Sequence, residues 1–211
     1  MTVLEQMQES VVIGNDSKVV ELTQKALDEG AAPEEILNKG FIPGMEIVGR
    51  KFQENEIYVP EMLMSARAMK AGMKLLEPFL TEAGIEPIGK IVIGTVKGDL
   101  HDIGKNLVAM MLEGAGFEVI DAGVDASAQK FIDMVKENKP DILCLSALLT
   151  TTMTEIKNVI EAFKEKDLRD DVKIMVGGAP LTEEYSKEIG ADGYSSDAAS
   201  AVDIAKELLG K

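Results

Sequence analysis

Residues 90–104 read KIVIGTVKGDLHDIG, and this stretch decides the fold. Its first seven residues are mostly aliphatic or β-branched, which is typical of a strand buried in a parallel sheet. Residues 105–112 have a helical pattern, so the polar residues in between form a loop at the carboxyl end of a strand. Open α/β sheets bind ligands at that end of their strands, and the loop therefore predicts a binding site.

The loop contains His101, the single histidine of the 211 residues. Imidazole is the commonest metal ligand in proteins, and Asp99 can accept a hydrogen bond from the ring nitrogen that does not bind the metal. Gly104 lets the backbone approach a ligand closely. A lone histidine is more often structural than functional, so the motif becomes informative only together with residues further along the chain.

Composition excludes several function classes. The formal charge is −15, from 22 basic and 37 acidic side chains, which disfavours nucleic acids and anionic membrane surfaces as partners. Cys144 is the only cysteine and lies in an apolar run, so we expect a buried free thiol and no disulfide within the chain. The sequence shows neither a charged-then-apolar leader nor an apolar run of eighteen residues. These features predict a cytoplasmic protein with no membrane or nucleic-acid partner.

The pattern of residues 1–88 predicts a bundle of four antiparallel helices. Glycine, asparagine and proline interrupt it at three places: residues 14–16, residues 30–33 and Gly40. Asp16 and Ser17 can cap one helix, and Pro33 can open another at its first position. A further helix is expected at residues 41–52.

A long last helix begins near Pro60. Its apolar residues follow i, i+4, i+7 and i+11 spacing and share one face: Met62, Ala66, Met69, Met73, Leu76 and Leu80. Such a stripe is by default the core of a bundle. Residues 84–89 form a linker rich in glycine and proline, and they are the expected hinge between this domain and the next.

Residues 89–211 alternate between strand and helix patterns. Strands are predicted at 90–95, 117–121, 141–146, 172–176 and 192–194, and helices at 103–115, 127–138, 152–165, 181–189 and 198–209. Five such units predict a second, α/β domain: a flavodoxin-like (Rossmann-like) five-stranded parallel sheet with helices on both faces. A strand order of 2-1-3-4-5 would bring the loops after strands one, three and four to one crevice.

That crevice lacks the sequence motifs that bind the phosphates of common nucleotide cofactors. There is no G-x-G-x-x-G after the first strand and no P-loop, and one histidine cannot build a zinc site. A single histidine with open space around it suits a metal that arrives inside a macrocycle and needs one axial ligand. Glycines and hydroxyl groups at the other two strand ends could form a slot for a polar appendage of such a cofactor.

Three motifs resemble the signature of cobalamin-binding domains, in residue type and in separation: Asp99-x-His101-x-x-Gly104, Ser146-x-Leu148 and Gly177-Gly178. Residues 96–106 are similar to methionine synthase and to the corrinoid proteins of methanol and methylamine methyltransferase systems. The resemblance continues upstream through residues 58–67 and 76–79, so it covers nearly the whole chain.

The resemblance implies that His101 replaces the corrinoid's own base as the cobalt ligand. Asp99 would hold the other ring nitrogen, and Thr152 stands where methionine synthase completes this relay with a serine. Two methionines of the long helix, Met62 and Met69, would cover the opposite face of the corrin. Other expected contacts of the corrin and its nucleotide tail are Gly98, Leu100, Asp102, Ile103, Gly104, Ser146, Leu148, Thr150, Gly177 and Gly178. Gly177 and Gly178 are expected to serve the tail more than the fold.

The resemblance also implies a function. The protein would carry a methyl group on cobalt of cobalamin or a related corrinoid, from a substrate-specific methyltransferase to a second methyltransferase that acts on a thiol or folate-type acceptor. A reductive activation protein is a further expected partner. No nucleophile-and-base pair accompanies the motifs, so the chain is a carrier subunit that does not catalyse alone. The alternatives are a subunit of an adenosylcobalamin-dependent mutase and a cobalamin-dependent regulator; the former generally lacks such a helical domain and the latter carries a basic DNA-binding head.

Overall fold

The computed structural model describes residues 1–211, which form two compact units. The helical unit comprises residues 1–87 and 114–116, and the sheet unit comprises residues 88–113 and 117–211. None of the helices is long and apolar enough to cross a membrane.

The helical unit contains six helical segments: α1 (Val3–Val12), α2 (Asp16–Asp28), α3 (Pro33–Ile36), η1 (Leu37–Phe41), α4 (Ile42–Gln53) and α5 (Val59–Glu82). Segments α3, η1 and α4 follow one another without a break and make one continuous helix with a π-helical turn in its middle. The unit therefore has four helical rods, as predicted, but the predicted interruption at Gly40 is wrong. A Cβ on Gly40 would lie 2.6 Å from Met7 Sδ, so this glycine allows close packing instead of ending a helix.

The ends of these helices follow local capping rules. Pro33 is the first residue of α3, as predicted. The cap of α2 is one residue earlier than expected, because the Asn15 side chain accepts a hydrogen bond of 3.0 Å from the backbone N–H of Lys18. Asp16 is instead the first helical residue, where its negative charge interacts favourably with the positive end of the helix dipole.

The apolar face of α5 forms part of the core of the helical unit. Met62 and Met69 are buried, together with Ala66, Leu76 and Leu80, whereas Met73 is half-buried. Helix α5 packs against α2 along this unit. The stripe predicted from the sequence is therefore a packing surface.

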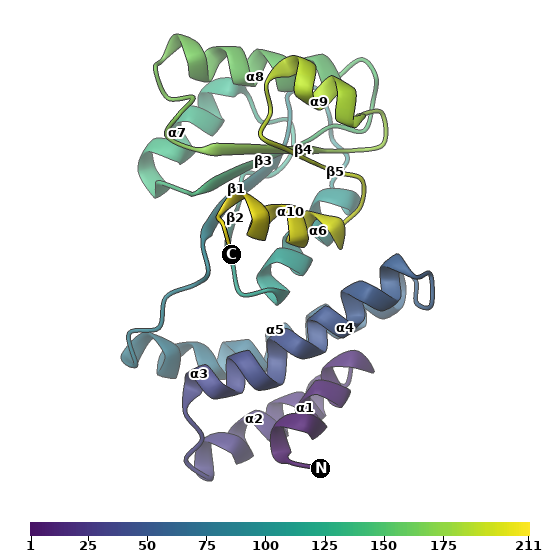
Figure 1. The fold of residues 1–211 in the computed structure, drawn as a ribbon, viewed down its shortest axis with the longest axis vertical. Coiled ribbons are helices and arrows are strands. Elements are labelled where there is room, and N and C mark those ends of the chain that lie inside the picture. The colour runs from purple at the N-terminus through teal and green to yellow at the C-terminus, as the bar shows by residue number, and fades with distance from the viewer. The chain divides into compact units, whose positions relative to one another are not determined.

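The sheet unit has a five-stranded parallel sheet of order β2-β1-β3-β4-β5, which confirms the predicted topology. Its strands are β1 (Lys90–Thr95), β2 (Glu118–Asp121), β3 (Ile142–Ser146), β4 (Lys173–Gly177) and β5 (Gly193–Ser195). Its helices are α6 (Ile103–Gly114), α7 (Ala128–Asn138), α8 (Met153–Glu165), α9 (Glu183–Ile189) and α10 (Ser200–Leu208). Helices α7, α8 and α9 lie on one face of the sheet, and α6 and α10 lie on the other (Figure 1).

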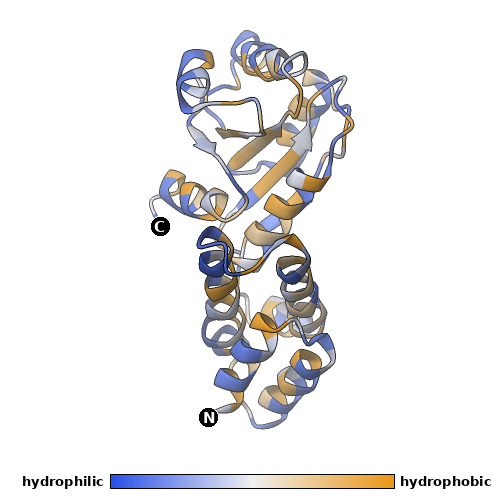
Figure 2. Cartoon of the chain, turned by 90° about the vertical axis from the view of Figure 1, so that its right-hand side faces the viewer, coloured by the Kyte–Doolittle hydropathy of each residue, from blue (hydrophilic) through white to orange (hydrophobic).

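Both faces of the sheet are covered, and this explains why the strands are continuous apolar runs. On one face, side chains such as Val92, Leu143 and Ile174 pack with Phe131 of α7 and Phe163 of α8. Figure 2 shows the central strands in the colour of hydrophobic residues. Cys144 of β3 is a buried free thiol, as expected, and burial raises the pKa of this thiol above its ordinary value.

Candidate cofactor site

The carboxyl edge of the sheet brings the three sequence motifs together. The last residues of four strands form one row across the sheet, with Thr95 opposite Ser146, Ser146 opposite Gly177, and Gly177 opposite Ser195. The loop after β1 carries Asp99 and His101, and the other two motifs continue from the next two strand ends. The topology thus collects residues from distant parts of the chain at one edge.

His101 and Asp99 form a short contact at this edge. The Nδ1 atom of His101 lies 2.6 Å from Oδ1 of Asp99. The aspartate side chain is fully buried, whereas the imidazole side chain is 50% exposed. One ring nitrogen is therefore fixed by the protein, and the other, Nε2, remains available to a ligand.

The second oxygen of Asp99 binds the loop after β3. It accepts hydrogen bonds from Thr152 Oγ1 at 2.6 Å and from the backbone N–H of Leu148 at 2.8 Å. Thr152 is buried, and its side chain makes no capping hydrogen bond to α8, although it directly precedes that helix. The structure therefore contains both predicted contacts, the one between His101 and Asp99 and the one between Asp99 and Thr152.

The charge of Asp99 determines which ring nitrogen of His101 carries a proton. Burial by itself would raise the pKa of Asp99, but hydrogen bonds from Thr152, Leu148 and His101 outweigh burial and hold this pKa well below its ordinary value. An ionised carboxylate can only accept hydrogen bonds, so Nδ1 of His101 must carry the proton. The neutral imidazole then has its lone pair on Nε2, which is the form that binds a metal.

Replacing Asp99 by asparagine should lower the free energy of unfolding of the cofactor-free protein by about 1–3 kcal/mol at pH 7, because Asn cannot accept all these hydrogen bonds. A lowered folded-state pKa stabilises the fold above the unfolded pKa of about 3.9, and the contribution is lost as pH falls through the folded-state value. Urea unfolding should show the difference between wild type and Asp99→Asn shrinking from pH 7 to about pH 3. A difference that stays constant with pH would contradict this account.

Exposed apolar side chains lie in the same loops as the imidazole. The large apolar residues exposed on the sheet unit are Leu100, Ile103, Leu148 and Leu149. All four lie in or next to the loops after β1 and β3, and Leu100 and Ile103 are 71% and 72% exposed. An apolar surface confined to the edge that carries a free ring nitrogen is typical of a ligand site.

Gly104 has open space where a side chain would begin. A Cβ at this position in the first turn of α6 would meet no atom within 4 Å. The fold of the protein itself therefore does not require glycine here.

The Gly104→Ala variant should keep or slightly raise the thermal stability of the cofactor-free protein, by up to about 1 kcal/mol, because alanine favours a helix. Its affinity for aquocobalamin should fall, because the new methyl group occupies open space in the helical turn that follows the histidine loop. Thermal unfolding and equilibrium binding test both parts. Unchanged binding with unchanged stability would show that no ligand approaches Gly104.

Gly178 corrects an expectation from the sequence. Its φ is +134°, and a Cβ built on it would lie 1.8 Å from the carbonyl oxygen of Ala147. The fold itself therefore requires this glycine, so the idea that it serves a nucleotide tail more than the fold is wrong. A Cβ on Gly177 would meet Ser195 atoms at 3.2–3.3 Å, which is tight but can be relieved by small shifts.

The remaining predicted residues differ in position. Gly98, Asp102 and Thr150 are exposed in the loops of this edge, and Ser146 is half-buried at the end of β3. Met62 and Met69 are buried in the helical unit. No contact in the structure assigns these residues to a cofactor, so their binding roles remain predictions.

Sequence reasoning missed two supporting residues. Thr95 is buried, and its hydroxyl donates a hydrogen bond of 2.9 Å to the carbonyl oxygen of His101. Lys105 of α6 is buried and binds both carboxylate oxygens of Asp121 at 2.7 Å. The sequence did contain a signal for each residue. Thr95 is a polar residue at the end of an apolar strand, and Lys105 is a lysine beside an apolar helical run; each needs a hydrogen-bond partner if it is buried.

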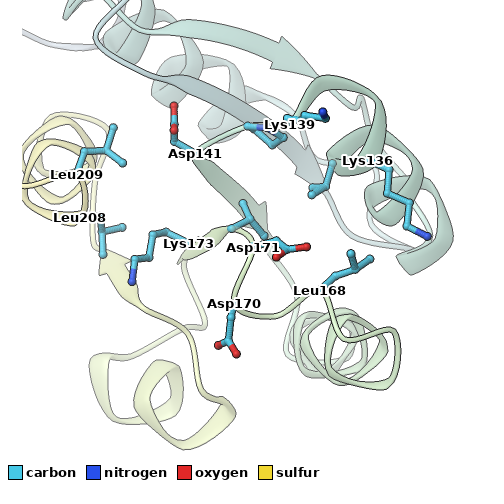
Figure 3. A pocket seen from close by; sticks show the side chains of 12 residues that line it. Lys136, Lys139, Asp141, Leu168, Asp170, Asp171, Lys173, Leu208 and Leu209 are labelled. Atoms are coloured by element: carbon cyan, nitrogen blue, oxygen red, sulfur yellow. The ribbon is translucent and has the colours of Figure 1, made fainter.

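A separate cavity of about 570 Å³ lies at the opposite, amino-terminal edge of the sheet (Figure 3). Side chains from the end of α7, the turn before β4 and the end of α10 surround it. Three lysines and three aspartates line it, so it offers no dominant charge: Lys136, Lys139, Lys173, Asp141, Asp170 and Asp171. It contains none of the residues of the three motifs.

The single imidazole at the carboxyl edge of the sheet fits a cofactor that supplies the other ligands of its metal. The structure contains no group of three or more His, Cys, Asp or Glu residues that could hold a metal ion. It offers one imidazole whose Nδ1 contacts Asp99 and whose Nε2 is free, and exposed apolar side chains lie in the same loops. A metal held by a macrocycle needs one such axial ligand and an apolar surface for the ring.

Comparisons with known proteins agree with this fit. Residues 89–203 match a B12-binding domain, and residues 3–77 match a second model with the same description. A corrinoid protein of Desulfitobacterium hafniense is 44% identical over 100% of this chain and 99% of its own length. Dimethylamine corrinoid protein 3 of Methanosarcina acetivorans is 46% identical over 98% of this chain and 96% of its own length.

Two solved structures share the complete architecture. A cobalamin-binding protein from Desulfitobacterium hafniense superimposes with a TM-score of 0.81 and 33% identity, covering 99% of both chains. A chain of the methanol:cobalamin methyltransferase complex of Methanosarcina barkeri gives a TM-score of 0.88 and 30% identity, covering 99% of this chain and 80% of that one. The chain therefore belongs to the corrinoid proteins of methyltransferase systems, which bind cobalamin or a related corrinoid through B12-binding domains.

Proposed function

We propose that the protein binds its corrinoid through Nε2 of His101 and carries a methyl group from a substrate-specific methyltransferase to a second methyltransferase. The observation that supports this most is the half-exposed imidazole, whose Nδ1 is held by a buried, ionised aspartate, together with exposed apolar side chains in the same loops. When bound, the corrinoid supplies the cobalt on which the methyl group is carried.

The chain's own residues bind the corrinoid and orient the imidazole of His101. Asp99 and Thr152 keep the proton of His101 on Nδ1, so that Nε2 is always free for cobalt. Four exposed apolar residues would offer the macrocycle an apolar surface and exclude water there: Leu100, Ile103, Leu148 and Leu149. Ser146, Thr150 and Gly177 are proposed to line the path of the nucleotide tail, beside the backbone of Gly178.

A methylamine is the methyl donor best supported by the relatives. Two of them are named for dimethylamine and trimethylamine, at 46% and 41% identity over 98% of this chain. The structural neighbour belongs to a complex that acts on methanol, so methanol is the alternative outcome of the test. The donor itself would be recognised by the partner methyltransferase. A thiol or folate-type acceptor on the second enzyme and a reductive activation protein complete the proposed set of partners.

Labelled methyl groups test the carrier role. The corrinoid-loaded protein would be incubated with candidate methyltransferases and ¹⁴C-labelled dimethylamine, trimethylamine or methanol, separated, and passed to a thiol methyltransferase. Label that appears on the loaded protein and then on the thiol supports the carrier role. No label from any donor, together with turnover that depends on the adenosyl form of the cofactor, would contradict it and favour a mutase subunit.

A further inference from the structure

We propose that Asp125, in the loop between β2 and α7, is a positioning residue that fixes Asp99 against His101. This inference rests on the proposed function, in which His101 binds cobalt. It adds a fourth loop to a site that the sequence motifs place on the loops after β1, β3 and β4.

Asp125 holds the histidine loop at two points. Its Oδ1 accepts a hydrogen bond of 2.7 Å from the backbone N–H of Gly98. Its own backbone N–H donates a hydrogen bond of 3.0 Å to the carbonyl oxygen of Asp99. One residue therefore fixes the peptide groups on both sides of the Gly98–Asp99 pair, and a charged acceptor makes the first of these bonds strong.

The loop that carries Asp125 is itself anchored to β1. The backbone N–H of Thr95 donates to the carbonyl oxygen of Gly123 at 2.9 Å, and the N–H of Ala126 donates to the carbonyl oxygen of Thr95 at 3.0 Å. Val96 and Ala126 form an isolated parallel bridge. These contacts flank Asp125 on both sides, so it is held by a firm support although its side chain is exposed.

The backbone of Asp125 has an unusual conformation. Its φ is +51°, in the left-handed region that costs most residues about 1 kcal/mol or more and that aspartate, asparagine and glycine tolerate best. Such a conformation persists where the surroundings hold it, and it often marks a functional site. Here it directs the side-chain oxygen and the backbone N–H of one residue at the same short loop.

The consequence concerns the geometry of Asp99. Its carboxylate accepts hydrogen bonds from His101 on its own loop and from Leu148 and Thr152 on the next. These bonds require a fixed backbone at Asp99, which Asp125 supplies. Loss of outer partners of a metal ligand typically weakens metal binding about 10- to 100-fold.

Three variants separate the side chain from the backbone conformation. Asp125→Gly keeps the positive φ but removes the carboxylate, and Asp125→Asn keeps both the conformation and an acceptor oxygen. Asp167→Gly is the matched control, because Asp167 has φ +55° at the end of α8, outside the site. His101 is the only histidine, so the ¹⁵N signals of its ring report on the Asp99 contact without ambiguity.

We expect Asp125→Gly to bind aquocobalamin about tenfold more weakly. The ring ¹⁵N signals of the cofactor-free form should shift toward those of an imidazole that exchanges between tautomers. Asp125→Asn should stay within about twofold of wild-type affinity, because an acceptor oxygen remains, and Asp167→Gly should match wild type in both measurements. Wild-type affinity and unchanged ring signals in Asp125→Gly would overturn the inference.

Two further outcomes remain decisive. If Asp125→Gly does not fold, Asp125→Asn decides, and a tenfold loss of affinity in that variant would overturn the hydrogen-bond account. If His101→Ala leaves the cobalt spectrum unchanged, the proposed function fails. The ring signals of the cofactor-free Asp125 variants would still decide whether Asp125 positions Asp99.

Discussion

The His101→Ala variant should lose the spectrum of histidine-ligated cobalt and bind aquocobalamin at least about 100-fold more weakly. Loss of the outer partners of a metal ligand already costs about 10- to 100-fold, and this substitution removes the ligand itself. Absorption spectra of the reconstituted protein and equilibrium dialysis measure the two effects. The fold should be unaffected, because the imidazole is half exposed.

The same variant offers a positive control. Free imidazole added to corrinoid-loaded His101→Ala should restore the spectrum of a nitrogen ligand, because the space left by the side chain opens to solvent. Lys97→Ala serves as the matched substitution, since Lys97 is exposed in the same loop and makes none of the described contacts. If His101→Ala and Lys97→Ala behave alike, His101 is not the ligand.

Gly178→Ala should lower the free energy of unfolding by about 3 kcal/mol or more, even without a cofactor. The Cβ would lie 1.8 Å from the Ala147 carbonyl oxygen, so the strands of the carboxyl edge must shift. Overpacking costs about 1–3 kcal/mol and an unfavourable positive φ about 1–2 kcal/mol more. Urea unfolding of the cofactor-free protein measures this difference.

Substitutions of two other glycines separate the cost of overpacking from the cost of the positive φ. Gly123 has φ +77° and nothing within 4 Å of a Cβ, so Gly123→Ala should show only the backbone cost of about 1–2 kcal/mol. Gly177→Ala meets Ser195 at 3.2 Å with an ordinary φ and should show a small packing cost. A Gly178→Ala variant no less stable than Gly123→Ala would contradict the close approach to Ala147.

The strands and their order could be predicted because the sheet is covered on both faces. Apolar runs such as residues 142–145 therefore stand out from the amphipathic helices that connect them. The three motifs could be assigned to one edge because parallel strands align their carboxyl ends, and the register of Thr95, Ser146 and Gly177 confirms this.

Other features depend on contacts between distant residues and could not be read from local pattern. Gly40 looked like a helix end, but its role is the space that Met7 occupies. Lys105 of α6 is buried because it pairs with Asp121 at the end of β2. Gly178 looked like part of a ligand slot, but Ala147 of the neighbouring strand end determines it.

Electron paramagnetic resonance of the cobalt(II) form tests the central claim most directly. The protein has one histidine, so labelling histidine with ¹⁵N changes a single imidazole. The account predicts that the nitrogen splitting of the cobalt signal changes from the ¹⁴N to the ¹⁵N pattern when the labelled protein binds unlabelled cobalamin. A splitting that keeps the ¹⁴N pattern would show that the corrinoid retains its own base, and it would contradict cobalt binding by His101.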